Sequence, residues 1–380
     1  MARKGAAVEP EGSSASACMR ERGGKIVGES QNIVGETAAR IFADFADPQT
    51  VNRAADGAWK EPLWQALAHA GLTLAWVPET LGGSGASLSD GFEVLTVAGR
   101  FAAPVPLAET LLAGWLLSTS GMPSPDGPMT IAPARPGDRI TLRPDGTLSG
   151  HARGVPFASE ARHLALLATG PAGPSVALVE RGACRVERGE NLASEASDIV
   201  TLDRAEPVRV APVPSGFDQT ALMLMGAAIR SVETAGALET ILALSVRYAD
   251  ERIAFERPIG KFQAVQHNLA RLAGEVAAAM TAAGSAADAI AGADDFDDAI
   301  FLEAASAKIR AAEAAQEGAA IAHQVHGAIG FTQEHVLHRF TLRMLAWRDD
   351  FGNESHWAAE LGSRVAARGA DEFWPLLASR

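Results

Sequence analysis

Cysteine is scarce in this chain of 380 residues, which contains only Cys18 and Cys184. The two lie far apart, and no histidine cluster with metal-ligand spacing accompanies them. Neither a disulfide-stapled scaffold nor a metal site is therefore expected. We expect two free thiols in a reducing compartment, and hence a cytoplasmic protein. The length predicts two or three domains, because a domain has roughly 100 to 200 residues.

Positive charge and long apolar runs are also lacking. The formal net charge is −13, so the chain is not expected to bind nucleic acid or anionic membranes. No apolar run approaches the roughly 18 residues of a membrane-spanning helix, and the N-terminus lacks the apolar core of a signal peptide. Membrane insertion is not expected. Residues 1–27, rich in glycine, serine and charges, are predicted to form a disordered tail.

The common signatures of nucleotide, zinc and serine chemistry are missing as well. There is no G-x-G-x-x-G after a predicted strand and no P-loop, which argues against a Rossmann dehydrogenase or a P-loop enzyme. There is also no H-E-x-x-H, C-x-x-C or G-x-S-x-G. Zinc hydrolysis and serine-elbow chemistry therefore lack their usual parts.

The spacing of apolar residues and the frequency of proline and glycine change twice along the chain. Apolar residues at helical spacing predict a helical segment over 28–122. Short β-rich runs between prolines and glycines predict a small β domain over 123–215. From residue 216 proline almost vanishes and apolar residues recur at steps of three and four, which predicts a four-helix bundle over 216–380. The expected fold class is α+β, mostly α. The runs expected as strands are 130–132, 164–167, 176–180 and 199–202.

Breaks in the C-terminal segment predict where its helices end. Pro258 is expected to end the first long helix, and the stretch from Gly260 begins a second. An acidic D-D-F-D-D loop precedes a third helix that begins near Ala299. Gly327 to Gly330 then breaks the chain before a last pair of helices.

The first motif that stands out is R-I-A-F-E-R-P-I-G-K-F-Q-A-V-Q-H, which begins at Arg252. The guanidinium groups of Arg252 and Arg257, beside a new helix N-terminus, have the chemistry to hold a pyrophosphate. The alternative is that both arginines neutralise Asp250, Glu251 and Glu256 on a solvated turn.

The second motif is Q-V-H-G-A-I-G-F-T-Q-E-H, a glycine loop that follows an alanine-rich helix and begins at Gln324. Its backbone amides and Gln324 have the chemistry to contact an adenine or a ribose. A plain helix C-cap is the commoner meaning of such glycines. The histidines of the motif are expected to be hydrogen-bonded structural groups.

Together with A-L-A-H-A-G-L-T-L-A-W-V-P-E-T-L-G-G-S-G in the N-terminal segment, these motifs resemble the acyl-CoA dehydrogenase family over nearly the whole chain. The resemblance implies an N-terminal helical domain, a central β barrel and a C-terminal four-helix bundle, usually assembled as a tetramer. It also implies FAD as cofactor, an acyl-CoA thioester as substrate, and formation of an α,β-double bond. Electron-transfer flavoprotein is the electron acceptor that the family leads us to expect.

The resemblance further implies a cofactor site. The matching positions of the family bind the ADP half of an FAD held mainly by a neighbouring subunit. In this chain they are Arg252, Phe255, Gln263, Gln324, Gly327, Ala328 and Gly330. The chain departs from the family at Glu256, where glycine is usual, and at Ala328, where glycine is frequent.

The positions that would hold this chain's own flavin ring do not match the family. The stretch from Met129 to Arg139 lacks the family's carboxylate and hydroxyl positions. The family's tryptophan and threonine columns fall on Gly154 and Pro156, and proline has no side-chain donor.

The catalytic base is missing from its usual places too. A base must lie beside the α-carbon of the substrate to remove its proton. The two columns in which the family places this glutamate fall on Phe351 and Gly226. Asp350 and Glu354 are the candidate substitutes if the loop is shifted by a residue.

The sequence therefore favours a subunit of a heteromeric α2β2 acyl-CoA dehydrogenase, acting in fatty acid or steroid side-chain oxidation. Such a chain completes the cofactor site of a partner and lacks its own base. Two alternatives stay open: a self-sufficient homotetramer with a displaced base, and a catalytically inactive acyl-CoA-binding or scaffold protein.

Overall fold

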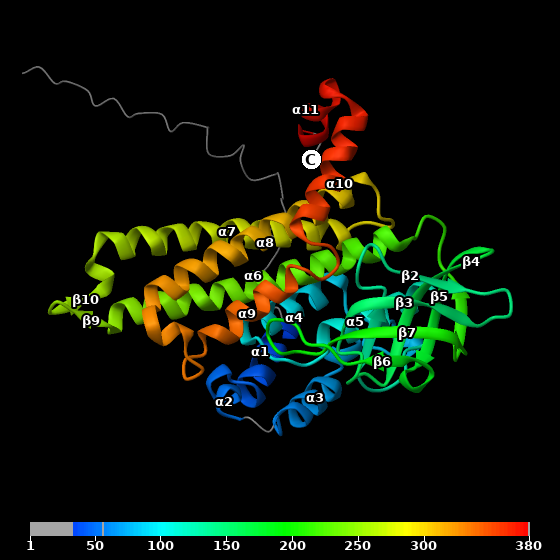
Figure 1. Cartoon of the computed structure of the whole chain (residues 1–380), viewed down its shortest axis with the longest axis horizontal. Coiled ribbons are helices and arrows are strands. Elements are labelled where there is room, and N and C mark those ends of the chain that lie inside the picture. Colours follow the sequence, from blue (N-terminus) through cyan, green and yellow to red (C-terminus); the bar gives the residue numbers. More distant parts are fainter. Residues whose placement is uncertain (1–32, 55–56, 379–380) are drawn as a thin grey trace, which may run out of the picture. The chain divides into compact units, whose positions relative to one another are not determined.

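The structure, a computed structural model, describes residues 33–54 and 57–378, and its N-terminal part is helical (Figure 1). The helices are α1 (Ile33–Phe45), α2 (Pro48–Arg53), α3 (Lys60–His69), the 3-10 turns η1 (Leu72–Leu74) and η2 (Glu79–Leu81), α4 (Leu88–Phe101) and α5 (Leu107–Thr119). Ser87 and Asp90 form a capping box that begins α4, because each side chain accepts a hydrogen bond from the other's backbone N–H. The tail predicted over 1–27 lies outside the described residues.

The middle of the chain forms an eight-stranded sheet. Its strands are β1 (Met129–Ala132), β2 (Arg139–Leu142), β3 (Leu148–Pro156), β4 (His163–Gly170), β5 (Gly173–Glu180), β6 (Arg185–Glu187), β7 (Ser197–Ala205) and β8 (Arg209–Pro212), with the 3-10 turn η3 (Arg181–Ala183) before β6. They pair in the order β6-β7-β3-β2-β4-β5-β8, and β1 lies parallel to β4. The sequence predicts β1, β4, β5 and β7. It misses the rest because glycine, proline and arginine interrupt their apolar pattern, as in β3, whose pairing with β7 shifts register twice.

Long helices make up the rest of the chain. The elements are α6 (Gln219–Glu251), β9 (Ile253–Ala254), β10 (Arg257–Pro258), η4 (Ile259–Lys261), α7 (Gln263–Ala291), α8 (Asp298–His326), η5 (Gly327–Phe331), α9 (Leu337–Trp347), α10 (Glu354–Arg368) and α11 (Ala370–Ala378). The start expected near Ala299 is confirmed by α8. Beyond the expected last pair, α9 and α10, the chain adds α11.

The prediction that Pro258 ends the first long helix is wrong. Helix α6 ends at Glu251, and the next residues turn back on themselves as the hairpin β9–β10. The backbone groups of Ile253 and Ala254 are paired across this hairpin, which replaces helical hydrogen bonding before the proline is reached. Helix α7 accordingly begins at Gln263, after the turn η4, and not at Gly260.

Helix α6 lies at the centre of the structure and packs against α4, α7 and α8. It meets α4 at two glycines: a Cβ atom on Gly99 would lie 2.1 Å from the Glu233 carbonyl oxygen, and one on Gly236 would lie 2.0 Å from that of Thr96. The two backbones therefore touch. Among the described residues α6 is long and apolar enough to cross a membrane, but its apolar window is entirely buried within the protein, as in the core helix of a globular domain.

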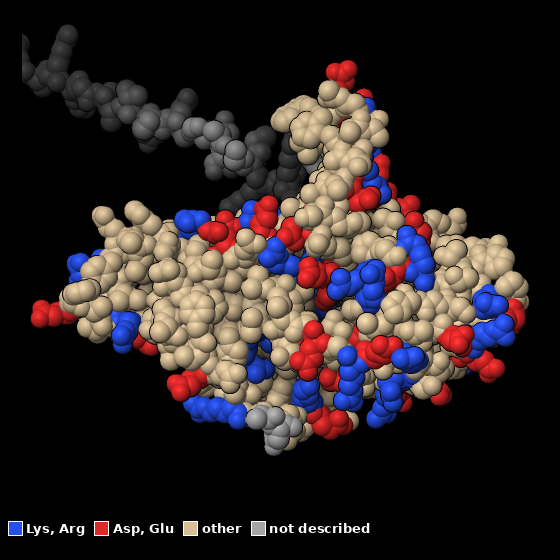
Figure 2. Space-filling view, in the orientation of Figure 1, with Lys and Arg blue, Asp and Glu red and all other residues tan. Residues whose placement is uncertain are grey.

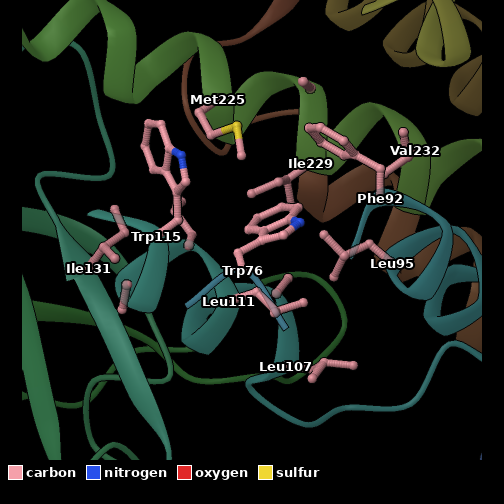
Figure 3. Packing of buried hydrophobic residues seen from close by; sticks show 14 of the residues in the cluster. Trp76, Phe92, Leu95, Leu107, Leu111, Trp115, Ile131, Met225, Ile229 and Val232 are labelled. Carbon is pink, nitrogen blue, oxygen red and sulfur yellow. The ribbon is translucent and has the colours of Figure 1, made fainter. Parts of the chain in front are cut away.

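One hydrophobic cluster joins the N-terminal helices, the first strand and the central helix (Figure 3). Trp115 of α5 and Trp76 lie against α6, with Ile131 of β1 beside Trp115. Met225 and Ile229 of α6 project towards the two indole rings. The region between the N-terminal helices and α6 is thus filled with apolar side chains.

Candidate functional site

The predicted cofactor residues gather at one end of the helical bundle. Because α7 runs antiparallel to both α6 and α8, the C-terminus of α6, the N-terminus of α7 and the C-terminus of α8 lie at the same end (Figure 1). Arg252, Gln263 and Gln324 stand at these three helix ends, and all three are exposed. The structure therefore brings the two sequence motifs together.

The hairpin between α6 and α7 holds Phe255 out into solvent. Ala254 pairs with Arg257, so Phe255 and Glu256 are the two turn residues, with φ of 50° and 65°. Both are left-handed, which such turns satisfy with asparagine and glycine rather than with phenylalanine and glutamate. Phe255 is 90% exposed. An unfavourable backbone that displays an aromatic ring is typical of a binding site rather than of a folding element.

Replacing Glu256 by glycine, the usual residue of the family, is expected to stabilise the chain by about 1 kcal/mol, because glycine adopts positive φ without steric cost. Chemical denaturation of the purified chain measures this. Glu187→Gly, a change of the same kind at an exposed strand position, is the control and is expected to destabilise. A loss of stability in the Glu256 variant would contradict the assigned turn.

The two arginines of the first motif have different environments. Arg257 lies over the ring of Phe262, with its guanidinium carbon 4.2 Å from the ring centroid. Among the described residues no ion pair joins Arg252 or Arg257 to Asp250, Glu251 or Glu256. The alternative of mutual neutralisation is therefore not what the structure shows, and Arg252 keeps its donors for another acceptor.

Two sets of backbone amides complete this end of the bundle. Helix α7 begins after Phe262, whose side chain offers no acceptor for the first amides of the helix. Gly327 ends α8 with φ of 63° and ψ of −143°, and a Cβ atom there would meet nothing within 4 Å. Ala328 is exposed like Gly327, whereas Gly330 is buried under His326. Gly330 thus allows the loop to pack closely against His326 and is not part of its exposed surface.

These groups fit the ADP half of FAD. A free guanidinium, a helix N-terminus and open glycine-loop amides are donors suited to a diphosphate, and an exposed aromatic ring suits stacking on adenine. All of them lie on the outside of the bundle. A nucleotide bound there would be open to solvent on its other side.

Phe351 and Gly226, the two positions on which counting along the sequence places the family's glutamate, lie against each other in this chain. Phe351 is buried, 1% exposed, and its ring occupies the space beside Gly226, where a Cβ atom would come within 2.3 Å of the ring. Because Gly226 has no side chain, the Phe351 ring can occupy this space. Neither column offers a carboxylate, and the space between them is closed.

Replacing Gly226 by alanine is expected to destabilise the chain by about 1–3 kcal/mol, because the new methyl group overlaps the Phe351 ring. Gly284→Ala in α7 is the matched control. A Cβ atom there meets nothing within 4 Å, so the substitution should stabilise by about 1 kcal/mol through helix propensity. Adding Phe351→Leu should recover part of the loss, and strictly additive denaturation energies would contradict the contact.

Asp350, the first candidate base, is held in a buried ion cluster. Arg230 of α6 donates to Asp350 (Nε to Oδ2, 2.9 Å), to Glu233 (2.6 Å) and to Glu109 of α5. Arg230, Glu109 and Glu233 are each less than 9% exposed. Lys308 of α8 lies near them and donates to the Trp347 carbonyl oxygen. The structure therefore ties Asp350 to a guanidinium and does not point it into an open site.

Burial governs the proton affinities in this cluster, which we call the Arg230 cluster (Glu109, Arg230, Glu233, Lys308 and Asp350). Desolvation raises the pKa of Glu109 and of Asp350, and it raises that of Glu233 to about 7, although Arg230 acts against it in each case. Desolvation also lowers the pKa of Lys308 to about 7. Sequence reasoning misses Glu109, Arg230 and Lys308. Two of them could have been noticed, because Glu109 and Arg230 are charged residues within apolar stretches of the sequence.

Glu354, the second candidate, begins α10 and pairs with Arg348. Its hydrogen bond from Arg348 lowers its pKa despite partial burial. A carboxylate that is occupied and made less basic is a poor proton acceptor.

The loop that would hold the flavin ring of this chain contacts the bundle directly. The Phe351 backbone N–H donates to the Ala134 carbonyl oxygen (3.1 Å), and the Gln219 amide donates to that of Asp138 (3.0 Å). The Arg135 guanidinium lies beside Gly154, within 2.7 Å of where a Cβ atom would be. The β domain and the bundle are thus joined by direct hydrogen bonds in the stretch 129–139, to which the resemblance would assign the flavin-ring contacts.

Comparisons with known proteins agree with this fold and these motifs. Residues 215–353 match the family described as acyl-CoA dehydrogenase, C-terminal domain. The acyl-CoA dehydrogenase IpdE2 of Mycobacterium tuberculosis is 32% identical over 318 residues, which are 83% of this chain and 91% of that protein.

Solved structures give the same result over the whole fold. A chain of the Tcur3481-Tcur3483 steroid ACAD superposes with a TM-score of 0.78 at 29% identity, covering 89% of this chain and 98% of that one. A chain of the ChsE4-ChsE5 complex from Mycobacterium tuberculosis gives 0.78 at 25% identity, covering 88% and 96%. Helical domain, central β domain and helical bundle are therefore confirmed as the family's fold, and the chain belongs to the acyl-CoA dehydrogenase family, oxidoreductases that act on acyl-CoA.

Proposed function

We propose that this chain is the subunit of a heteromeric acyl-CoA dehydrogenase that completes the FAD site of a partner subunit and does not remove the substrate proton itself. The observation that carries this proposal is the contact between Phe351 and Gly226. This contact supports the proposal, because counting along the sequence places the family's glutamate at these two positions. The partner then supplies the base and the contacts to the flavin ring.

The surface of the chain supports such an assembly. When bound, FAD supplies the acceptor for the hydride that leaves the β-carbon of the acyl thioester. Its ADP half is held from outside the bundle by Arg252, Gln263 and residues 327–330, which we call the Gly327 loop. A groove between α6 and α7 adjoins them and exposes Val246 (41%) and Met280 (37%). The bundle surface in Figure 2 carries few charged side chains over much of these helices, which suits contact with a second subunit.

The relatives suggest a substrate class and an assembly. One similar structure is described as a steroid ACAD and another as a complex of two named chains. We therefore propose a CoA thioester of a bulky acyl group, such as a steroid side chain, and an α2β2 tetramer with electron-transfer flavoprotein as acceptor. Fatty acyl thioesters are the alternative substrates in the test below.

The test is to purify the chain alone and after co-expression with acyl-CoA dehydrogenase chains of the same genome, and to measure flavin absorbance and acyl-CoA-dependent dye reduction. We expect little FAD in the isolated chain, and one FAD per pair of subunits with activity in the heteromer. A full FAD complement and turnover by the isolated chain would overturn the proposal. A preparation that binds acyl-CoA but stays colourless with every partner would instead support a scaffold.

Two variants separate this proposal from a self-sufficient enzyme. Asp350→Asn and Glu354→Gln, introduced into the active preparation, should leave the pH profile of turnover unchanged, since neither group is the base. If either were the base, its loss would cost at least about 10²-fold in rate. A Glu→Gln change in the partner at its own glutamate column is the positive control.

A further inference from the structure

Three aromatic side chains connect the two halves of the ADP site. Tyr248, four residues before Arg252 in α6, stacks on His326, the last residue of α8, with ring centroids 4.5 Å apart. His335, between η5 and α9, lies against the same histidine at 4.7 Å. Tyr248 is the only tyrosine of the chain. This stack therefore fixes the Gly327 loop relative to the end of α6 that carries Arg252.

One hydrogen bond shows which ring nitrogen of His326 carries a proton. Its Nδ1 lies 2.8 Å from the Ala322 carbonyl oxygen, so Nδ1 carries a proton and donates it. In the neutral ring Nε2 is then an acceptor. The residue is 3% exposed, and among the described residues Nε2 has no hydrogen-bond partner. A buried acceptor without a donor is costly, so its retention points to a function.

The groups around His326 are mostly basic. Tyr248 faces it from α6, His335 from the segment before α9 and His323 from its own helix. Arg247 and His338 lie close to His335. Glu334 is exposed beside His335. Burial lowers the pKa of His326, and burial together with the neighbouring histidines and Arg247 lowers that of His335. In the free chain these rings are neutral near pH 7.

We propose that His326 is a positioning residue for the nucleotide site, and that it takes up a proton from solvent at Nε2 when a nucleoside diphosphate binds against Arg252 and the Gly327 loop. This inference rests on the proposed function. The reason is electrostatic: the negative charges of the diphosphate, placed next to Gly327, stabilise the imidazolium of His326, which burial disfavours. Tyr248 then faces the charged ring, a favourable cation–π contact.

The expected pH dependence follows from linkage. A group whose pKa is raised by binding makes binding stronger at low pH, and the gain is lost as the pH rises through the bound-state pKa. Affinity should therefore fall as the pH rises from 6 to 8, by up to about tenfold per pH unit for one proton.

The experiment is isothermal titration of the deflavinated heteromer with ADP at several pH values, each in two buffers of different ionisation enthalpy, which counts the protons taken up. We expect close to one proton near pH 7 in the wild type. His326→Asn keeps a donor for the Ala322 carbonyl but does not titrate. It should therefore bind ADP with about one proton fewer than the wild type, which leaves only the proton exchange of the ADP phosphate itself. His69→Asn, at an exposed position of α3, should behave like the wild type.

The outcomes separate the inference from the function beneath it. ADP binding with no proton uptake overturns the inference about His326 but leaves the proposed ADP site unaffected. Proton uptake that persists in His326→Asn also overturns it. Absence of ADP binding at every pH overturns both. Tyr248→Phe should retain the stack and the proton uptake, whereas Tyr248→Leu should weaken ADP binding at pH 6 more than at pH 8, because it removes the ring that faces the charged imidazole.

Discussion

Replacing Arg230 by methionine is expected to lower the free energy of unfolding by about 3–5 kcal/mol at pH 7.5, the usual cost of leaving buried charges without their partner. Arg230 donates to Glu109, Glu233 and Asp350 at once. Methionine fills a similar volume, so the loss reports the three stranded carboxylates and not a cavity. Urea denaturation followed by circular dichroism measures it.

The same variant should recover part of its stability in acid. Arg230 lowers the pKa of each of the three carboxyl groups, against the desolvation that raises them. Without Arg230 their folded-state pKa values rise further above the unfolded values. A carboxyl group with a raised folded pKa costs stability above its unfolded pKa, and the cost disappears as the pH falls towards that value. The difference from the wild type should therefore shrink between pH 7.5 and pH 5.

Arg100→Met is the matched control, because Arg100 also pairs with carboxylates, Glu93 and Glu239, but is more than a third exposed. Its loss should cost less than about 1 kcal/mol and vary little with pH. Equal losses for the two arginines, or a loss for Arg230→Met that stays constant with pH, would mean that the Arg230 cluster does not carry the stability assigned to it.

The sequence predicts the fold well where local signals are strong. Three and four residue spacing predicts α6 to α8, and alternating textures predict the order helix, sheet, bundle. The prediction fails where backbone pairing between two short strands overrides a local sequence signal. Pro258 is a helix breaker, but the hairpin of Ile253 and Ala254 with Arg257 and Pro258 ends α6 seven residues earlier. Such a hairpin is too short to show a strand pattern.

The candidate site divides in the same way. The residues predicted to bind ADP belong to two short contiguous motifs, and the structure brings these motifs together at one end of the bundle. The Arg230 cluster joins Arg230 to Glu109, 121 residues before it, and to Asp350, 120 residues after it. No spacing rule connects such positions. The contact between Gly226 and Phe351 is likewise long-range, although the sequence does show that neither residue is an acid.

Replacing Arg252 by alanine is expected to weaken FAD binding by the assembled heteromer about tenfold to a hundredfold, because a charge-assisted hydrogen bond to a phosphate is worth about 1.5–3 kcal/mol. The structure leaves the Arg252 guanidinium without an ion-pair partner among the described residues, so its donors are available to the diphosphate. FAD affinity, measured by titrating flavin fluorescence into the deflavinated heteromer, gives the change directly.

Arg257→Ala is the matched control for this experiment. Arg257 lies in the hairpin that follows Arg252, and its replacement removes the same charge, but its guanidinium is already held over Phe262. A change within about threefold is expected for it, since a cation–π contact in place competes with other partners. If both variants weaken FAD equally, net charge and not the position of Arg252 holds the nucleotide. If neither does, the ADP half of the partner's FAD is bound elsewhere, and this chain does not complete that site.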